Sequence, residues 1–161
     1  MATRTPLVLV NGQIQQLQVG DQIVVAAATY DARTATNGEA STALTAGMPV
    51  YTAAAGSVKR AQANAAATAG VSGIWLDAST AAAGNGNYAA GGVAVCTTVQ
   101  WDAVTGQTGG LTAGALYFLD PATAGKLTTT APTTVGQLVT CVGRALSATD
   151  LEFDVQLPIL L

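Results

Sequence analysis

Three carboxylates near the end of the sequence are the side chains best placed to do chemistry. Asp150, Glu152 and Asp154 alternate with apolar residues. Because successive side chains of a β-strand point to opposite faces, a strand here would place all three carboxylates on one face. Such a row could supply a general acid and base or bind Ca²⁺, but no neighbour looks able to raise one of the pKa values, and no EF-hand loop is present. We therefore expect a solvated strand face that could meet basic groups of a partner, with neither a catalytic nor a metal centre.

A second segment with a chemical signature is Gly84-Asn-Gly-Asn-Tyr-Ala89, which fits the GxGxxA pattern of dinucleotide-binding loops. In those loops the glycines follow a strand and open a helix whose N-terminus faces the pyrophosphate. Here the surrounding residues 80–92 form a Gly/Ala/Asn-rich stretch that leads into a predicted strand. We therefore predict a flexible hairpin loop and no cofactor.

The residues that usually activate a catalytic nucleophile are missing from this sequence. The sequence contains no histidine, which excludes Ser/His/Asp and Cys/His sites and removes the commonest general base. Cys96 and Cys141 lie in apolar settings without CxxC or metal-ligand spacing, so we expect buried thiols rather than a disulfide. The sequence therefore predicts that the protein is not an enzyme.

The large aromatic residues allow two interpretations. Trp75, Tyr88, Trp101 and Tyr117 could form an exposed platform on which a sugar ring stacks. Aromatic residues make up only 5% of the chain, however, and a small body built from Ala, Val and Leu needs large side chains to fill its core. We expect these four residues to be core fillers.

Charge is scarce along the whole sequence. Only 9% of the residues are charged, against about 25% in a typical soluble domain, and the net charge is -3. The longest basic run is the pair Lys59-Arg60, which argues against nucleic acid as a partner. The longest apolar run, Ile23 to Ala28, is far shorter than the roughly 20 residues of a membrane-spanning helix, so we expect a protein made in the cytoplasm without a membrane partner.

The same composition predicts association. The chain has 33 Ala, 23 Thr and 18 Gly, and its 6 basic and 9 acidic residues would be spread over a large surface. A monomer of this mass exposes roughly 7,400 Å², or about 500 Å² per charge. So neutral a surface favours packing against other chains, and we predict a homo-oligomer.

Short apolar or alternating runs, interrupted by Gly, Asn and Pro, predict an all-β fold: a small β-barrel or sandwich preceded by an extended N-terminal arm. We assign residues 1–28 to the arm, 29–42 to a linker loop and 43–161 to the body. In the arm, Asn11-Gly12 between two apolar runs predicts a hairpin with a type I′ turn. Residues Ala61 to Ala69 are the one segment that could instead form a helix, of two turns at most. The body strands are predicted at 49–52, 58–61, 71–76, 93–101, 115–119, 126–129, 137–142 and 151–157.

The body also contains an internal repeat. Leu44-Thr-Ala-Gly47 recurs as Leu111-Thr-Ala-Gly114, and Gly73-Ile-Trp-Leu-Asp-Ala-Ser79 recurs in the same order as Gly143-Arg-Ala-Leu-Ser-Ala-Thr149. Two matches in one order favour a duplication over chance similarity. We predict two pseudo-symmetric halves of one small closed sheet, joined by the strand at 93–101.

Several segments carry a resemblance to a known group of proteins. Pro6-Leu-Val-Leu-Val-Asn-Gly-Gln-Ile-Gln-Gln-Leu17, followed by Gly20-Asp21, resembles a segment of tailed-bacteriophage virion proteins. The segments Gly110-Leu-Thr-Ala-Gly-Ala-Leu-Tyr-Phe-Leu119, Gly136-Gln-Leu-Val139, Val142-Gly-Arg-Ala-Leu-Ser-Ala148 and Gln156-Leu-Pro-Ile159 are similar to phage capsid decoration (cement) proteins and to head or tail fibre domains. The resemblance implies a structural protein, usually a homotrimer, on the outer surface of the virion.

A compact body with a neutral surface and a short arm favours cement, which would bridge subunits of the major capsid protein and stabilise the shell. The residues expected to contact other subunits or the shell are Leu7, Leu9, Ile14 and Leu17, because a two-stranded hairpin needs an external apolar surface. The alternatives are a fibre or adhesin module that binds a host-surface glycan, and a tail-associated hydrolase. Exposed, clustered Trp or Tyr residues would favour the fibre.

Overall fold

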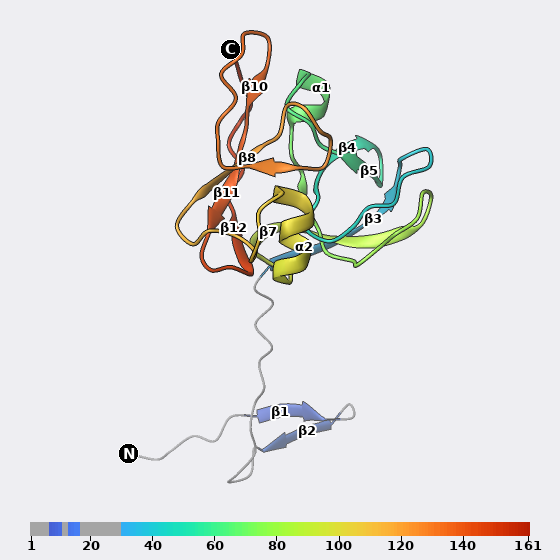
Figure 1. The fold of residues 1–161 in the computed structure, drawn as a ribbon. Coiled ribbons are helices and arrows are strands. Elements are labelled where there is room, and N and C mark those ends of the chain that lie inside the picture. The colour runs from blue at the N-terminus through green and yellow to red at the C-terminus, as the bar shows by residue number, and fades with distance from the viewer. Residues whose placement is uncertain (1–6, 11–12, 17–29) are drawn as a thin grey trace.

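The computed structural model describes residues 7–10, 13–16 and 30–161 (Figure 1). Strands make up 40% of the structure and helices 9%, so the predicted all-β class is confirmed. The body is organised around a nine-stranded sheet, whose strands are β3 (Tyr30–Asn37), β4 (Pro49–Ala54), β5 (Ser57–Arg60), β6 (Gly73–Trp75), β7 (Asn85–Val95), β8 (Leu116–Leu119), β9 (Leu127–Thr128), β11 (Cys141–Ala145) and β12 (Asp150–Phe153).

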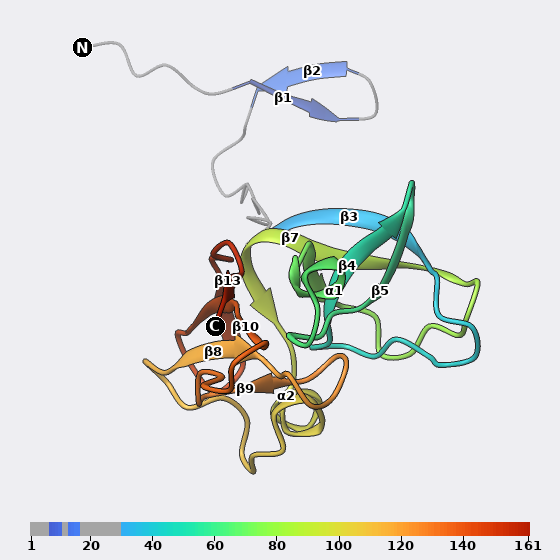
Figure 2. The ribbon, with the colours of Figure 1, turned by 90° about the horizontal axis from the view of Figure 1, so that it is seen from above.

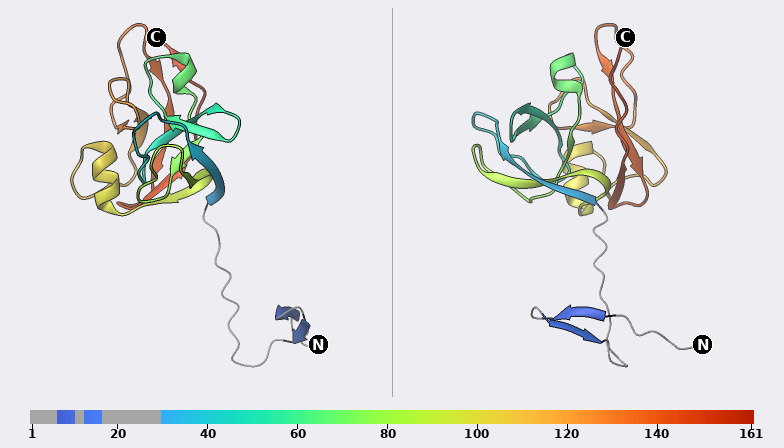
Figure 3. Two further views of the ribbon diagram at one scale, coloured as in Figure 1. Left: turned by 90° about the vertical axis from the view of Figure 1, so that its right-hand side faces the viewer. Right: turned by 180° about the vertical axis from the view of Figure 1, so that it is seen from behind.

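The strands of this sheet lie in the order β3-β5-β4-β6-β7-β12-β11-β8-β9, and β3 also pairs with β7. Figures 2 and 3 show β3 running beside β7 while β4 and β5 curl over it. The curl does not make a closed barrel: β3 meets β5 through only two residue pairs, and the sheet continues past β7 to β9. The expectation of a closed sheet is therefore wrong.

Two short ribbons accompany the large sheet. β1 (Leu7–Val10) and β2 (Gln13–Gln16) form the predicted antiparallel hairpin, with Leu9 opposite Ile14. Its turn residues Asn11 and Gly12 lie outside the described residues, as does Leu17. The second ribbon pairs β10 (Leu138–Val139) with β13 (Ile159–Leu160).

The linker predicted at residues 29–42 is wrong over most of its length, because residues 30–37 form β3. This strand has no apolar alternation: five of its residues are exposed or half-buried before Ala35. Pairing with β7 holds it in place, and threonine hydroxyls bond to asparagines across the two strands, Thr34 to Asn87 at 3.1 Å and Thr36 to Asn85 at 2.8 Å.

The strand predicted at 93–101 is also wrong in its second half. β7 ends at Val95, and α2 (Thr98–Thr105) follows. Thr97 and Gln100 form a capping box: the Thr97 hydroxyl accepts from the Gln100 amide, and the Gln100 side chain accepts from the Thr97 amide. Gly106, with φ 70°, ends the helix. Of the possible helix at 61–69, only the single turn of α1 (Ala66–Ala69) is present.

The internal repeat is confirmed by the pairing of the strands. Repeat 1 comprises β4 to β7 in the order β5-β4-β6-β7, and repeat 2 has the matching order β9-β8-β11-β12. The repeats meet where β7 pairs with β12. Equivalent strands pair in the same register, as four residue pairs show: Pro49 with Ile74 and Val50 with Gly73 in repeat 1, and Leu116 with Arg144 and Tyr117 with Gly143 in repeat 2.

The turns of the repeats correspond as well. Gly47 donates its amide to the Trp75 carbonyl at 2.9 Å, and Gly114 donates to the Ala145 carbonyl at 2.8 Å. Both glycines have left-handed backbones, with φ values of 89° and 81°. The recurring Leu-Thr-Ala-Gly motif therefore encodes one turn that fastens the start of each repeat to its third strand.

Each repeat covers its inner apolar face with the segment that precedes this turn. In repeat 1 that segment is β3, which contributes Ala35 to a cluster with Val50 and Trp75. In repeat 2 it is α2, which contributes Trp101 to the main core beside Tyr117. Thus β3 and α2 occupy equivalent places in the sequence of the two repeats, and each covers the apolar face of its own repeat.

Candidate interaction surface

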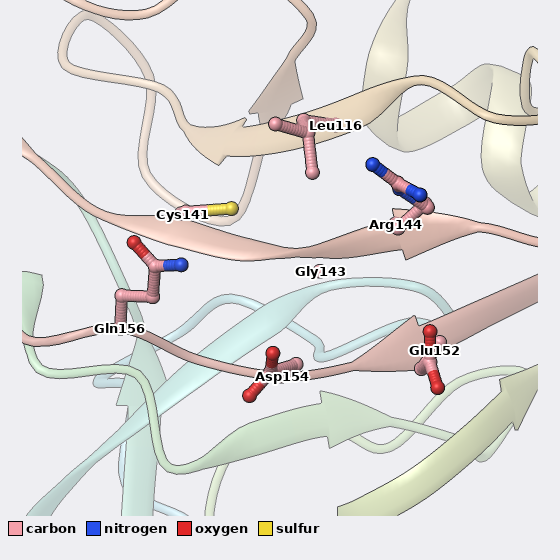
Figure 4. A pocket seen from close by; sticks show the side chains of 7 residues that line it. All are labelled: Leu116, Cys141, Gly143, Arg144, Glu152, Asp154 and Gln156. Atoms are coloured by element: carbon pink, nitrogen blue, oxygen red, sulfur yellow. The ribbon is translucent and has the colours of Figure 1, made fainter.

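Two of the three sequence-predicted carboxylates, Glu152 and Asp154, line a surface depression of about 400 Å³ between β8, β11 and β12. Figure 4 shows the side chains around it. Its lining residues are Leu116, Cys141, Gly143, Arg144, Glu152, Asp154 and Gln156. The depression is open to solvent, with exposed charged groups on β11 and on the segment that begins with β12.

The three carboxylates do not act as one row. Asp150 is half-buried and holds the turn before β12, where its carboxylate accepts hydrogen bonds from Ser147 Oγ at 2.9 Å and Thr149 Oγ1 at 3.1 Å. Glu152 and Asp154 are exposed and line the depression. The predicted solvated strand face therefore holds for Glu152, whereas Asp154 is exposed just beyond the end of β12 and Asp150 stabilises a turn.

Two other carboxylates in the described part of the chain stabilise turns. Asp102 accepts from the amides of Gly109 at 3.1 Å and Gly110 at 2.6 Å, and Asp120 accepts from the two amides that follow Pro121. Arg144 lies opposite Glu152 in the sheet, yet the two make no ion pair. The depression therefore gathers charged groups that the described fold does not use.

Arg60, one half of the only basic pair, is also engaged within the fold. Its Nε lies 3.1 Å from Glu39 Oε1, which also accepts from the Arg60 amide at 3.0 Å. Burial favours the neutral acid, but the Arg60 amide and guanidinium together outweigh it and lower the pKa of Glu39. Arg60 is therefore committed to a partly buried ion pair rather than to a basic surface.

Both cysteines are free and buried, which confirms the prediction of buried thiols. Burial raises the pKa of Cys96 to about 11, although the Gly47 amide opposes the shift. Burial also raises the pKa of Cys141, the Gly143 amide opposes this, and the charge of Asp154 adds to it. Because the thiolate is the nucleophile, these raised pKa values lower the reactivity of both thiols near neutral pH.

The aromatic residues fill the core, as predicted. Trp75, Trp101 and Tyr117 are fully buried, and Tyr88 is half-buried. The Trp101 indole donates to the Thr149 carbonyl at 2.8 Å, which fixes α2 on repeat 2. An aromatic platform for sugar stacking is therefore absent from these four positions.

The glycines of the GxGxxA segment serve packing. Gly86 lies inside β7, not at the start of a helix, and a Cβ there would collide with Trp75, Asp77 and Thr80. The flexible hairpin loop predicted for residues 80–92 is therefore wrong from Asn85 onward, because residues 85–92 belong to β7. A phosphate-binding loop needs a following helix, which this segment lacks.

Among residues 7–10, 13–16 and 30–161, no group of three or more His, Cys, Asp or Glu side chains is placed to hold a metal ion. In the same ranges, no helix is long and apolar enough to cross a membrane. No family model matches the sequence, and no curated protein resembles it significantly.

The exposed apolar side chains around β10 and β13 were not predicted from the sequence. Exposed fractions are 86% at Val135, 87% at Leu157, 62% at Ile159 and 68% at Leu160. All four lie on or beside the ribbon of β10 and β13, which projects from the body in Figures 1 and 3. A usable signal was the absence of charged residues from 127–143 and from 155–161.

Proposed function

We propose that the chain is a structural virion protein that decorates the outside of a phage capsid and stabilises it by bridging major capsid protein subunits, as a homotrimer. One observation carries the proposal: the described surface pairs an exposed apolar ribbon with a scarcity of charge. Patches of this kind mark protein–protein contacts. The resemblance of the arm and of repeat 2 to virion proteins supports the same function.

The mechanism is mechanical. Three copies bound to one another straddle the joints between shell subunits, so opening a joint also requires breaking the contacts of the trimer. Interfaces of about 1,600 Å² made by three linked copies gain strength through avidity, without any single strong contact. Such a role needs neither a reactive thiol nor an acid–base pair.

A fibre module that binds glycan has less support. Its stacking platform would draw on the large aromatic side chains, and Trp75 and Trp101 are inaccessible to solvent. The exposed side chains of the ribbon are aliphatic, which suits contact with protein.

The test uses particles of the parent phage with and without the protein. Electron microscopy should show density repeated regularly over the shell, and particles lacking the protein should open at lower temperature and regain stability when it is added back. Density confined to a vertex or to the tail, with unchanged thermal stability of the shell, would contradict the proposal.

A further inference from the structure

The ribbon formed by β10, β13 and the flanking residues 135–137 and 157–158, here called the C-terminal ribbon, presents an open edge. Leu138 pairs with Leu160 across the ribbon, and the Leu138 amide also donates to the Ala63 carbonyl at 2.9 Å. Thus β10 is bonded toward the body, whereas β13 pairs with β10 alone in the described part of the chain. An exposed, apolar edge strand is a ready template for a strand from another chain.

The chemistry of this edge restricts its occupant. Neither 127–143 nor 155–161 contains a charged residue, so the occupant must be neutral and apolar. The charged depression nearby is a poor alternative, because removing Arg144 or Glu152 from water would carry a desolvation cost. A basic or acidic partner is therefore disfavoured at the ribbon.

The chain itself contains a segment of matching chemistry. The β1–β2 hairpin lies within residues 5–20, which hold no charged residue, and β1 reads Leu-Val-Leu-Val. The hairpin is a separate two-stranded sheet, and such a sheet is marginal in water unless another strand or surface joins it. Two neutral, two-stranded sheets of one chain thus each lack a neighbour in the described structure.

We infer that the β13 edge of one subunit takes up the β1–β2 hairpin of a second copy, giving a four-stranded sheet shared between subunits. The inference rests on the homo-oligomer in the proposed function and names the surfaces that form it. Main-chain hydrogen bonds along β13 supply affinity, and the exposed apolar side chains of β13 supply selectivity. Because hairpin and edge are different surfaces, the contact is head-to-tail and closes into a ring when three copies are joined.

The test compares full-length variants by sedimentation equilibrium. Ile159→Lys changes the ribbon and Leu9→Lys changes the hairpin, while Val99→Lys is the matched control, since Val99 is 73% exposed on α2. The wild type should reach about 48 kDa, three times the chain mass of 16.0 kDa. Each interface variant should weaken association about 10- to 100-fold, which corresponds to about 1.4–2.8 kcal/mol, and the control should not. Urea unfolding of each variant checks that it is folded.

The double variant decides whether the two surfaces touch each other. If they do, combining Ile159→Lys with Leu9→Lys should weaken association by clearly less than the product of the single effects. Multiplicative effects, an unaffected Leu9→Lys protein, an equal loss with Val99→Lys or a monomeric wild type would each overturn the inference. Cosedimentation of the wild-type trimer with undecorated particles distinguishes the subunit contact from the decoration function. A trimer that does not bind the particles would contradict only the decoration function.

Discussion

Substituting the two equivalent turn glycines with alanine should expose the asymmetry between the repeats. Gly47 and Gly114 both have left-handed backbones and donate equivalent hydrogen bonds. Their surroundings differ: a Cβ on Gly47 would lie 3.1 Å from Val104 Cγ2 and 3.3 Å from Trp101 Cε3, whereas a Cβ on Gly114 would meet nothing within 4 Å. Gly114→Ala is therefore the matched control for Gly47→Ala.

The two variants share one cost and differ in another. Alanine in a left-handed conformation costs about 1–2 kcal/mol, so Gly114→Ala should lower the free energy of unfolding by that amount. Gly47→Ala also overpacks the contact with α2, which adds about 1–3 kcal/mol. Trp101 cannot move aside easily, because it is fully buried and its indole is bonded to Thr149. We expect a total loss of about 2–5 kcal/mol for Gly47→Ala.

Urea unfolding followed by tryptophan fluorescence measures both losses, since Trp75 and Trp101 are in the core. Thermal unfolding should agree, with the melting temperature falling by about 2–4 °C for each kcal/mol. Equal destabilisation by the two variants would refute the reasoning, because it would mean that the turn of repeat 1 does not pack on α2.

Three further predictions concern the helix cap, the ion pair and the depression. Thr97→Ala removes the capping box and should cost about 1 kcal/mol in urea unfolding, whereas Thr97→Ser should cost less. Because the pKa of Glu39 is lowered, its ion pair with Arg60 stabilises the protein fully above the ordinary pKa of 4.5. This contribution is lost as the pH falls through the lowered pKa, so the stability advantage of wild type over Glu39→Gln should shrink as the pH is lowered below 4.5. The double variant Glu152→Gln/Asp154→Asn should change the free energy of unfolding by less than about 0.5 kcal/mol, because both side chains are exposed. EDTA should not alter the stability of the wild type, and a loss of stability with EDTA would reveal a bound cation.

The strands that the sequence predicted are those whose signals are local. β4, β5, β6 and β8 fall within two residues of their expected bounds. β4, β6 and β8 are short apolar runs ended by Gly or polar residues, whereas β5 reads Ser-Val-Lys-Arg. The repeat was also visible, because the turn it encodes needs glycine at Gly47 and at Gly114. Strand order and register came only from the structure, since they depend on pairing between distant segments.

The missed elements were those that depend on a partner strand or on a weaker local signal. β3 reads as polar loop because its threonines face asparagines of β7 rather than a core. α2 was hidden by the apolar residues that precede it, although Thr97-Thr-Val-Gln100 carries the capping-box pattern of a helix start. The apolar edge strand β13 was missed because an exposed apolar run has the same sequence signature as a buried one.

Equivalent positions of the two repeats differ in burial and charge. Ile74 lies opposite Ala89 in repeat 1, and both are completely buried against the main core. Their counterparts Arg144 and Glu152 lie opposite each other in repeat 2 and are exposed at the depression. At these equivalent positions, repeat 1 has apolar residues that the main core covers, and repeat 2 has charged residues that are exposed to solvent. A face that a partner covered would be expected to keep apolar residues like Ile74, so the depression is a wet surface, and the apolar ribbon of β10 and β13 is the better candidate for contact between subunits.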